Sequence, residues 1–291
     1  MSTRAFPGRW WGYVMDTLVS AQWLAEHLPD PQLRVFDATM LVQIPTLRTG
    51  EPEWRQQHIP GSAFADLFAL SDPERPKWSM TMPSAEQFAT VIGALGVSNH
   101  THVVVYDRRE NMWAARLWWM LRAFGYDDAA ILDGGWTAWQ QGGYPICGTP
   151  CSYPPATFTA SPRPEMVADK QEVLAAIGKP EICLINALGR RQHRGEVSEY
   201  GRPGHIPGSR NVTAWEILDR ETQRYRPLSE LQRKVGSVLE AEQIITYCGA
   251  GPAASSLAHV LVRLGHPHVA VYDGGLIEWC ADPSLPLELG T

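Results

Sequence analysis

One cysteine stands in a setting that favours nucleophilic chemistry. In the segment ITYCGAGPAASS (residues 245–256), Cys248 follows an apolar run and precedes two glycines and a small, helix-prone stretch. Glycines permit conformations that point successive N–H groups inward, and a helix N-terminus adds partial positive charge. Because this arrangement stabilises an anion, we expect Cys248 to be a thiolate at neutral pH that attacks without a neighbouring general base.

Another interpretation of this loop stays open. Cys248 could be an ordinary buried residue at a strand end, with the glycines only making a turn. Pro252 also removes one amide from the loop, although a missing N–H costs little at the first position of a helix. We favour the nucleophile, because a thiol on a glycine loop is a costly way to make a turn.

The helices and strands that must position Cys248 belong to the second of two similar halves of the sequence. Three motifs recur in the same order: HIPGSAFADL (58–67) and HIPGSRNVTA (205–214), VVVYD (103–107) and IITYC (244–248), ILDGGWTAW (131–139) and VYDGGLIEW (271–279). Such repetition predicts two similar domains. The expected boundaries are a first domain over 1–145, an extended linker rich in proline, serine and threonine over 146–164, and a second domain over 165–291.

Each half has the pattern of an α/β domain. Short β-branched runs alternate with helical patterns, which is typical of a mainly parallel sheet flanked by helices. IITY predicts a strand and PAASSLAHVLVRL the helix after it, so Cys248 is expected at the carboxyl edge of the sheet, where open α/β folds bind ligands. Asp169 and Ser229, each followed three residues on by Glu or Gln, predict helix starts.

The two copies act as an internal control. His58 and His205 occur in both halves and are interpreted as turn-fixing residues, and the Asp-Gly-Gly segments as structural turns. The position after the buried strand differs, with Asp107 in the first half and Cys248 in the second. This position is therefore the candidate for chemistry.

The amino-acid composition limits which binding partners and which cellular compartment we expect. The formal net charge of −6 and the absence of any run of 18 apolar residues argue against nucleic-acid and membrane partners. Five scattered cysteines suit a reducing compartment, so we expect a cytoplasmic protein. Cys147 and Cys151 have no matching pair nearby, and no metal, nucleotide or flavin motif is present, so neither a metal nor a cofactor is expected.

Taken together, the strand-Cys-x-x-Gly-x-x-Ala-helix pattern and the repeated His-Ile-Pro-Gly-Ser and Asp-Gly-Gly motifs resemble the two-domain rhodanese family of sulfurtransferases. The resemblance implies that Cys248 takes sulfur from a small anionic donor, thiosulfate or 3-mercaptopyruvate, and carries it as a persulfide. It then passes the sulfur to cyanide, a small thiol or a thioredoxin-like protein. The resemblance also implies a cradle for the persulfide made by the amides of Gly249, Ala250, Gly251, Ala253 and Ala254. It further implies that the first domain, which has Asp107 in place of a thiol, is catalytically silent.

The donor is left open between two branches of this family. Gly249 and Ala250 are closer to the Gly-Ser of the mercaptopyruvate branch than to the Arg-Lys of the thiosulfate branch, but the serine hydroxyl is missing. Of the two arginines that hold a carboxylate in the mercaptopyruvate branch, one corresponds to Leu188 and the other to Arg194. Arg194 is therefore the candidate substrate-binding side chain.

Two other functions compete with sulfur transfer. Related cysteine phosphatases and arsenate reductases need an arginine six residues after the cysteine, where this chain has Ala254, so this class is disfavoured. A rhodanese-like binding or sulfur-relay module with little activity on small donors remains the alternative, because Leu188, Asn186 and Pro252 depart from the family pattern.

Overall fold

The computed structural model describes residues 9–10, 13–14, 16–43 and 46–290, and the chain divides into two compact units. Unit 1 comprises the described residues up to Lys77 together with Met82–Pro162 and Asp219–Tyr225. Unit 2 comprises Trp78–Thr81, Arg163–Leu218 and the residues from Arg226 onward. Each unit therefore includes a short segment from the other half of the sequence.

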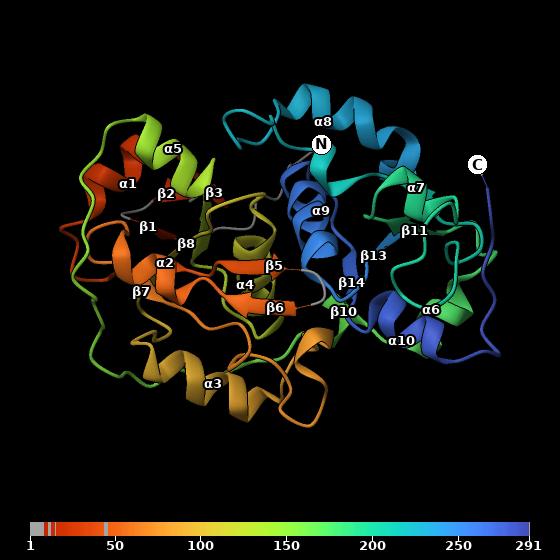
Figure 1. Cartoon of the computed structure of the whole chain (residues 1–291), viewed down its shortest axis with the longest axis horizontal. Coiled ribbons are helices and arrows are strands. Elements are labelled where there is room, and N and C mark those ends of the chain that lie inside the picture. The colour runs from red at the N-terminus through yellow and green to blue at the C-terminus, as the bar shows by residue number, and fades with distance from the viewer. Residues whose placement is uncertain (1–8, 11–12, 15, 44–45, 291) are drawn as a thin grey trace. The chain divides into compact units, whose positions relative to one another are not determined.

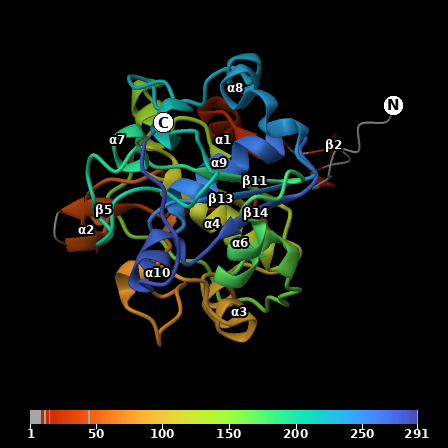
Figure 2. The same cartoon turned by 90° about the vertical axis from the view of Figure 1, so that its right-hand side faces the viewer.

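Unit 2 is built on a parallel sheet with strand order β10-β14-β13-β11-β12. Its strands are β10 (Val167–Ala168), β11 (Ile182–Asn186), β12 (Arg210–Asn211), β13 (Gln243–Tyr247) and β14 (Val269–Tyr272). Its helices are α6 (Lys170–Ala176), α7 (Arg190–His193), α8 (Leu228–Val235), α9 (Pro252–Arg263) and α10 (Gly275–Ala281). Figures 1 and 2 show α9 on one face of this sheet and α6 and α10 on the other.

Unit 1 repeats the same sheet, with order β3-β9-β8-β4-β7 and all neighbours parallel. Its strands are β3 (Leu18–Val19), β4 (Leu33–Asp37), β7 (Ala63–Phe64), β8 (His102–Tyr106) and β9 (Ala129–Leu132). Its helices are α1 (Ala21–His27), α2 (Glu51–Gln56), α3 (Ala85–Ala94), α4 (Met112–Ala123) and α5 (Gly135–Gln141). The predicted tandem α/β duplication is confirmed element by element.

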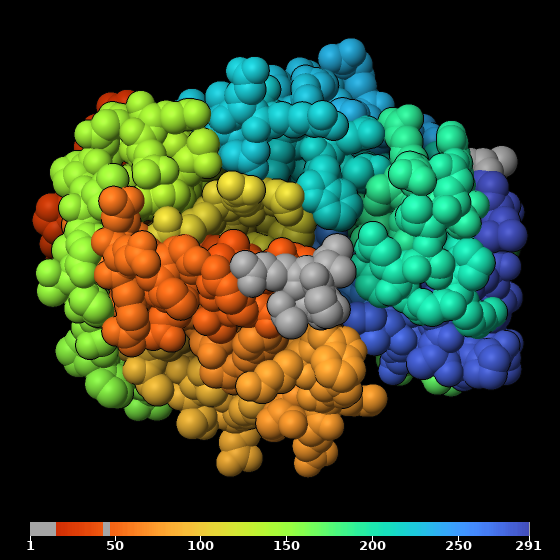
Figure 3. Space-filling view, viewed as in Figure 1, coloured from red at the N-terminus to blue at the C-terminus, as the bar shows by residue number. Residues whose placement is uncertain are grey.

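Two antiparallel pairs complete unit 1. They are β1 (Arg9–Trp10) with β2 (Tyr13–Val14), and β5 (Met40–Gln43) with β6 (Thr46–Thr49). The second pair lies at the surface of unit 1, where the orange atoms in Figure 3 show it, and Val42 is exposed there. These hairpins have no counterpart in the sheet of unit 2.

Local sequence explains most of the helix boundaries. The Asp169 side chain accepts from the amides of Gln171 and Glu172, and the Glu172 side chain accepts from the Asp169 amide, which is the predicted capping box. Ser229 is different, because α8 begins at Leu228, with Pro227 as its N-cap, and no side chain caps this helix. Proline presets the backbone at that point, so the prediction of a cap at Ser229 was wrong.

The segment predicted as a linker has little regular secondary structure and, up to Pro162, belongs to unit 1. The Tyr153 hydroxyl accepts from the Val35 amide and donates to the carbonyl of Gly61. Phe158 is buried and packs edge-on against Phe88. Its aromatic side chains hold this stretch in place, whereas its prolines prevent regular structure.

No helix in the described part of the chain is long and apolar enough to cross a membrane.

Candidate functional site

The cysteine loop joins β13 to α9 at the carboxyl edge of the second sheet, as the sequence predicts. Cys248 is 2% exposed, and its Sγ accepts a hydrogen bond of 3.1 Å from the Gly251 amide. Gly251 is the N-cap of α9 with φ +100°, and Pro252 is the first residue of the helix. The left-handed φ explains the glycine, and the proline occupies the position where its missing N–H is best tolerated.

The start of α10 holds this loop from the other side. The Leu276 and Ile277 amides donate to the carbonyls of Cys248 and Gly249 at 2.8 and 3.1 Å. Gly275 has φ +56°, and a Cβ there would lie 2.7 Å from the Cys248 carbonyl oxygen and would overlap that of Gly249. The Asp-Gly-Gly motif is therefore structural, because its second glycine lets α10 approach the cysteine loop.

Tyr200 is a site residue that sequence reasoning missed. It lies between α7 and β12, and its phenol packs on the Cα of Gly249, where a Cβ would overlap the ring and the hydroxyl. Gly249 does not have a left-handed φ. Since its backbone does not require glycine, the close approach of Tyr200 explains this residue, and no local pattern in the sequence signals the pair.

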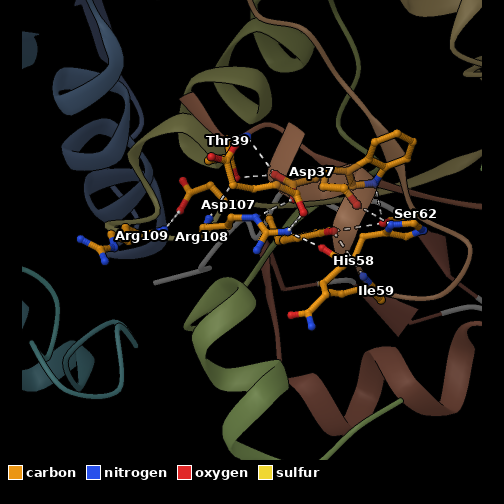
Figure 4. A network of polar contacts seen from close by, with 12 residues as sticks. Asp37, Thr39, His58, Ile59, Ser62, Asp107, Arg108 and Arg109 are labelled. Carbon is orange, nitrogen blue, oxygen red and sulfur yellow. Dashed lines mark hydrogen bonds and ion pairs between the residues drawn. The ribbon is translucent and has the colours of Figure 1, made fainter. Parts of the chain in front are cut away.

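In unit 1 a carboxylate occupies the corresponding position. Asp107 is 1% exposed, and its two oxygens accept from the amides of Arg109, Asn111, Trp113 and Ala114 at 3.0 to 3.1 Å. Figure 4 shows Asp107 beside Asp37, Thr39 and Arg108 in a buried polar network. The Asp107 side chain therefore takes up the amides of this loop itself, and the catalytic silence of this copy stays a prediction.

Burial raises the pKa of Asp107 to about 7, and the amides of Ala114, Asn111 and Trp113 oppose that shift. Desolvation also raises the pKa of the fully buried Asp37, although Thr39 and Arg108 stabilise its charge. Arg108 Nε lies 3.6 Å from Asp37 Oδ2. The two neighbouring acids make this network sensitive to pH.

The shared histidines support their turns in both units. His58 Nδ1 lies 2.7 Å from the Trp54 carbonyl and stacks on that indole, and His205 Nδ1 lies 2.7 Å from the His193 carbonyl and stacks on that imidazole. Both are buried. These contacts agree with the interpretation of His58 and His205 as turn-fixing residues.

Asn186 and Leu188 have structural contacts at the end of β11. Asn186 Oδ1 accepts from the Leu188 amide at 2.9 Å, and its Nδ2 lies 3.2 Å from His193 Nδ1. Leu188 is 5% exposed.

Burial, followed by the charge of His205, lowers the pKa of His193 to about 4, so this imidazole is neutral at pH 7.

Arg194 lies at the C-terminus of α7, and its side chain is 51% exposed, with Nη1 3.7 Å from Glu196. Arg190 and Arg191 also pair with carboxylates, those of Glu216 and Glu196. Exposed pairs of this kind contribute little to stability, so these side chains can exchange partners.

Of the five predicted cradle amides, that of Gly251 contacts the sulfur in the free protein. Gly249 is buried and Ala250 half-buried in the loop, and Ala253 and Ala254 lie in the first turn of α9. The amides of a first helical turn have no carbonyl partner within the helix. The cradle formed by the other four residues stays a prediction.

Comparisons with known proteins place these features in a family. The sequence family described as "Rhodanese-like domain" matches residues 20–142 and 171–282. The 3-mercaptopyruvate sulfurtransferase of Escherichia coli (strain K12) is 36% identical over 275 residues, covering 93% of this chain and 97% of that protein. The thiosulfate sulfurtransferase of Rattus norvegicus is 33% identical over 274 residues, covering 90% and 91%.

A solved structure agrees with these relatives. The crystal structure of SseA from Escherichia coli, described as a 3-mercaptopyruvate sulfotransferase with the rhodanese fold, superposes with a TM-score of 0.81 at 34% identity. The match covers 90% of this chain and 99% of that one.

Proposed function

The chain belongs to the rhodanese family and is a sulfurtransferase, and we propose that Cys248 carries the transferred sulfur as a persulfide. The observation that carries this proposal is the hydrogen bond from the Gly251 amide to Cys248 Sγ at the N-terminus of α9. A thiolate at a helix N-terminus is stabilised by the helix dipole and by unpaired amides.

The proposed cycle has two displacements. The Cys248 thiolate attacks the sulfur of the donor, a sulfur–sulfur bond forms and the bond to the rest of the donor breaks with its electron pair. An acceptor then attacks the outer sulfur of the persulfide, and the Cys248 thiolate leaves. The loop amides of Gly249, Ala250, Gly251, Ala253 and Ala254 are proposed to hold the outer sulfur.

The proposed donors are 3-mercaptopyruvate and thiosulfate, on which the relatives named above act. The half-exposed guanidinium of Arg194 is proposed to meet the anionic end of the donor, in exchange for its long contact with Glu196. Cyanide, a small thiol or a thioredoxin-like protein is the proposed acceptor. All five cysteines are free, which supports a reducing compartment such as the cytoplasm.

Replacing Cys248 with serine tests this function. We expect the purified wild type to transfer sulfur from at least one of the two donors to cyanide or a dithiol, with double-displacement kinetics. Cys248→Ser should lose this activity, because a serine hydroxyl is not ionised at neutral pH. Mass spectrometry after donor treatment should show one added sulfur atom on Cys248.

Cys183→Ser is the matched control, because Cys183 is a half-buried free thiol on β11 of the same unit. It should keep wild-type turnover. If Cys248→Ser retains activity, the proposed nucleophile is wrong. If wild type gains the sulfur but turns over no small acceptor, a sulfur-relay module replaces the enzyme cycle.

A further inference from the structure

The loop after Cys248 has no polar side chain of its own. Residues 249–254 read Gly-Ala-Gly-Pro-Ala-Ala, so the loop offers only backbone groups to a substrate. Backbone amides can hold the transferred sulfur, but they do not extend to the other end of a donor molecule. A side-chain hydrogen bond to a donor at Cys248 must therefore come from another element.

Tyr200, which belongs to another part of the chain, packs against this loop. Its phenol lies on the Cα of Gly249, the residue next to Cys248, and a Cβ at position 249 would overlap its hydroxyl and Cζ. Because Gly249 has no left-handed φ, the fit to Tyr200 is the physical reason for glycine at this position. The loop and the tyrosine are therefore matched to each other.

Tyr200 is a neutral hydrogen-bond donor. Burial, the charge of Cys248 and that of Glu199 all raise its pKa, so the phenol keeps its proton at neutral pH. Its hydroxyl makes no hydrogen bond within the part of the chain that the structure describes. A partly buried O–H without a partner is available to an oxygen atom of a ligand.

We propose that Tyr200 donates a hydrogen bond to the keto oxygen of a 2-oxo thiol donor as sulfur leaves it, which favours such donors over thiosulfate. This inference rests on the proposed sulfur transfer through Cys248. With 3-mercaptopyruvate, the Cys248 thiolate attacks the donor sulfur, the carbon–sulfur bond breaks and its electron pair passes into the enolate of pyruvate. The proton of the donor thiol then passes to the carbon to give pyruvate, and the persulfide is left as its anion.

The two donors differ in what Tyr200 can stabilise. Negative charge builds on the keto oxygen as the enolate forms. A preorganised hydrogen-bond donor that points at this oxygen lowers the barrier. Thiosulfate instead releases sulfite, a stable dianion that leaves with the electron pair of the sulfur–sulfur bond and forms no enolate. Loss of the hydroxyl should therefore slow the first donor and not the second.

Tyr200→Phe tests this selectivity, because it keeps the ring and removes the hydroxyl. In single-turnover persulfide formation with 3-mercaptopyruvate, the maximal rate should fall about 10- to 100-fold, the usual cost of one oxyanion donor or less. The donor concentration at half-maximal rate should change little. With thiosulfate, and in alkylation of Cys248 by iodoacetamide, rates should stay within about twofold, which a merely structural role would not produce.

Gly249→Ala provides a second, independent variant. The three atoms nearest to the new methyl group all belong to the far end of the Tyr200 side chain, so the phenol can move away and the fold can persist. This variant should lower the rate with 3-mercaptopyruvate, and it should lower that rate little further in the Tyr200→Phe background, because both changes remove the same interaction. Gly189→Ala is the control, since a Cβ there meets nothing within 4 Å and its φ is −61°.

The outcomes separate this inference from the proposed function. If wild type forms no persulfide with either donor, the proposed function fails before the variants are compared. If wild type uses 3-mercaptopyruvate and Tyr200→Phe keeps its rate within twofold, the role of Tyr200 is refuted. Equal losses with both donors and in alkylation would also refute it, because they indicate damage to the loop.

Discussion

At the scale of single residues, the two units differ in the residue directly after their central strand. Asp107 and Cys248 both lie between a buried tyrosine and a helix, and both are buried. The Asp107 carboxylate accepts hydrogen bonds from four backbone amides, whereas the Cys248 sulfur accepts a hydrogen bond from one. The amides of the unit 1 loop are thus taken up by the Asp107 side chain, whereas in the unit 2 loop the Gly251 amide is the one that contacts the Cys248 sulfur.

Asp107 should also make the stability of unit 1 depend on pH. Its pKa is about 7 in the folded chain and 3.8 as an ordinary carboxyl, so between these values the folded state holds a proton that the unfolded state has released. The free energy of unfolding should therefore fall as the pH rises from about 4 to 7, by up to about 4 kcal/mol at 1.36 kcal/mol per pKa unit. Denaturant unfolding across this range measures the slope.

Asp107→Asn tests whether Asp107 causes this dependence of the unfolding free energy on pH. The amide keeps the shape of the side chain but cannot ionise, so its stability should vary less with pH between 4 and 7 than that of wild type. Absolute stability should drop, because the Asn NH2 group would face two N–H donors. Parallel pH profiles for the two proteins would mean that Asp107 does not titrate in this range.

At the scale of elements, the contact between α10 and the cysteine loop decides whether Cys248 is held in place. Gly275→Ala combines a left-handed φ with overlap on the Gly249 carbonyl, so we expect a loss of about 1–2 kcal/mol of stability or more. Sulfur transfer should fall at least tenfold, because the loop must shift. Steady-state kinetics and thermal unfolding together measure both effects.

Gly135→Ala is its matched control in unit 1. Gly135 has φ +50°, and its Cβ would overlap the Asp107 carbonyl, as that of Gly275 overlaps the cysteine loop. The strain is therefore similar, but it falls on the loop that carries Asp107 instead of the cysteine. If Gly135→Ala lowers sulfur transfer as much as Gly275→Ala does, the effect is general destabilisation and not displacement of Cys248.

At the scale of the whole molecule, each unit includes a segment from the other half of the sequence. Segment 219–225 belongs to unit 1, where Gln223 accepts from the Glu110 amide and the Asn111 side chain, and the Tyr225 amide donates to Asp133. Glu110, Asn111 and Gln223 all have left-handed φ. These mutual contacts hold conformations that each residue alone would disfavour.

A fragment of residues 1–164 should therefore be less stable than unit 1 in the intact chain. It lacks segment 219–225, which leaves the Glu110 amide and the Asn111 side chain without these partners. We expect a lower melting temperature and faster proteolysis in the loop after Asp107. Addition of a peptide covering 219–225 should raise the melting temperature, whereas an intact-like melt of the fragment alone would argue against this dependence.

The sequence by itself determined the duplication, the α/β class, the position of Cys248 between β13 and α9, and helix starts such as Asp169. These follow from periodicity, caps and repeats, which are local properties of the chain. Only the tertiary structure decided that Tyr200 packs on Gly249, that Asp107 takes four amides and that segment 219–225 joins unit 1. Such contacts join residues far apart in sequence, and local propensity carries no information about which distant side chain fills a given space.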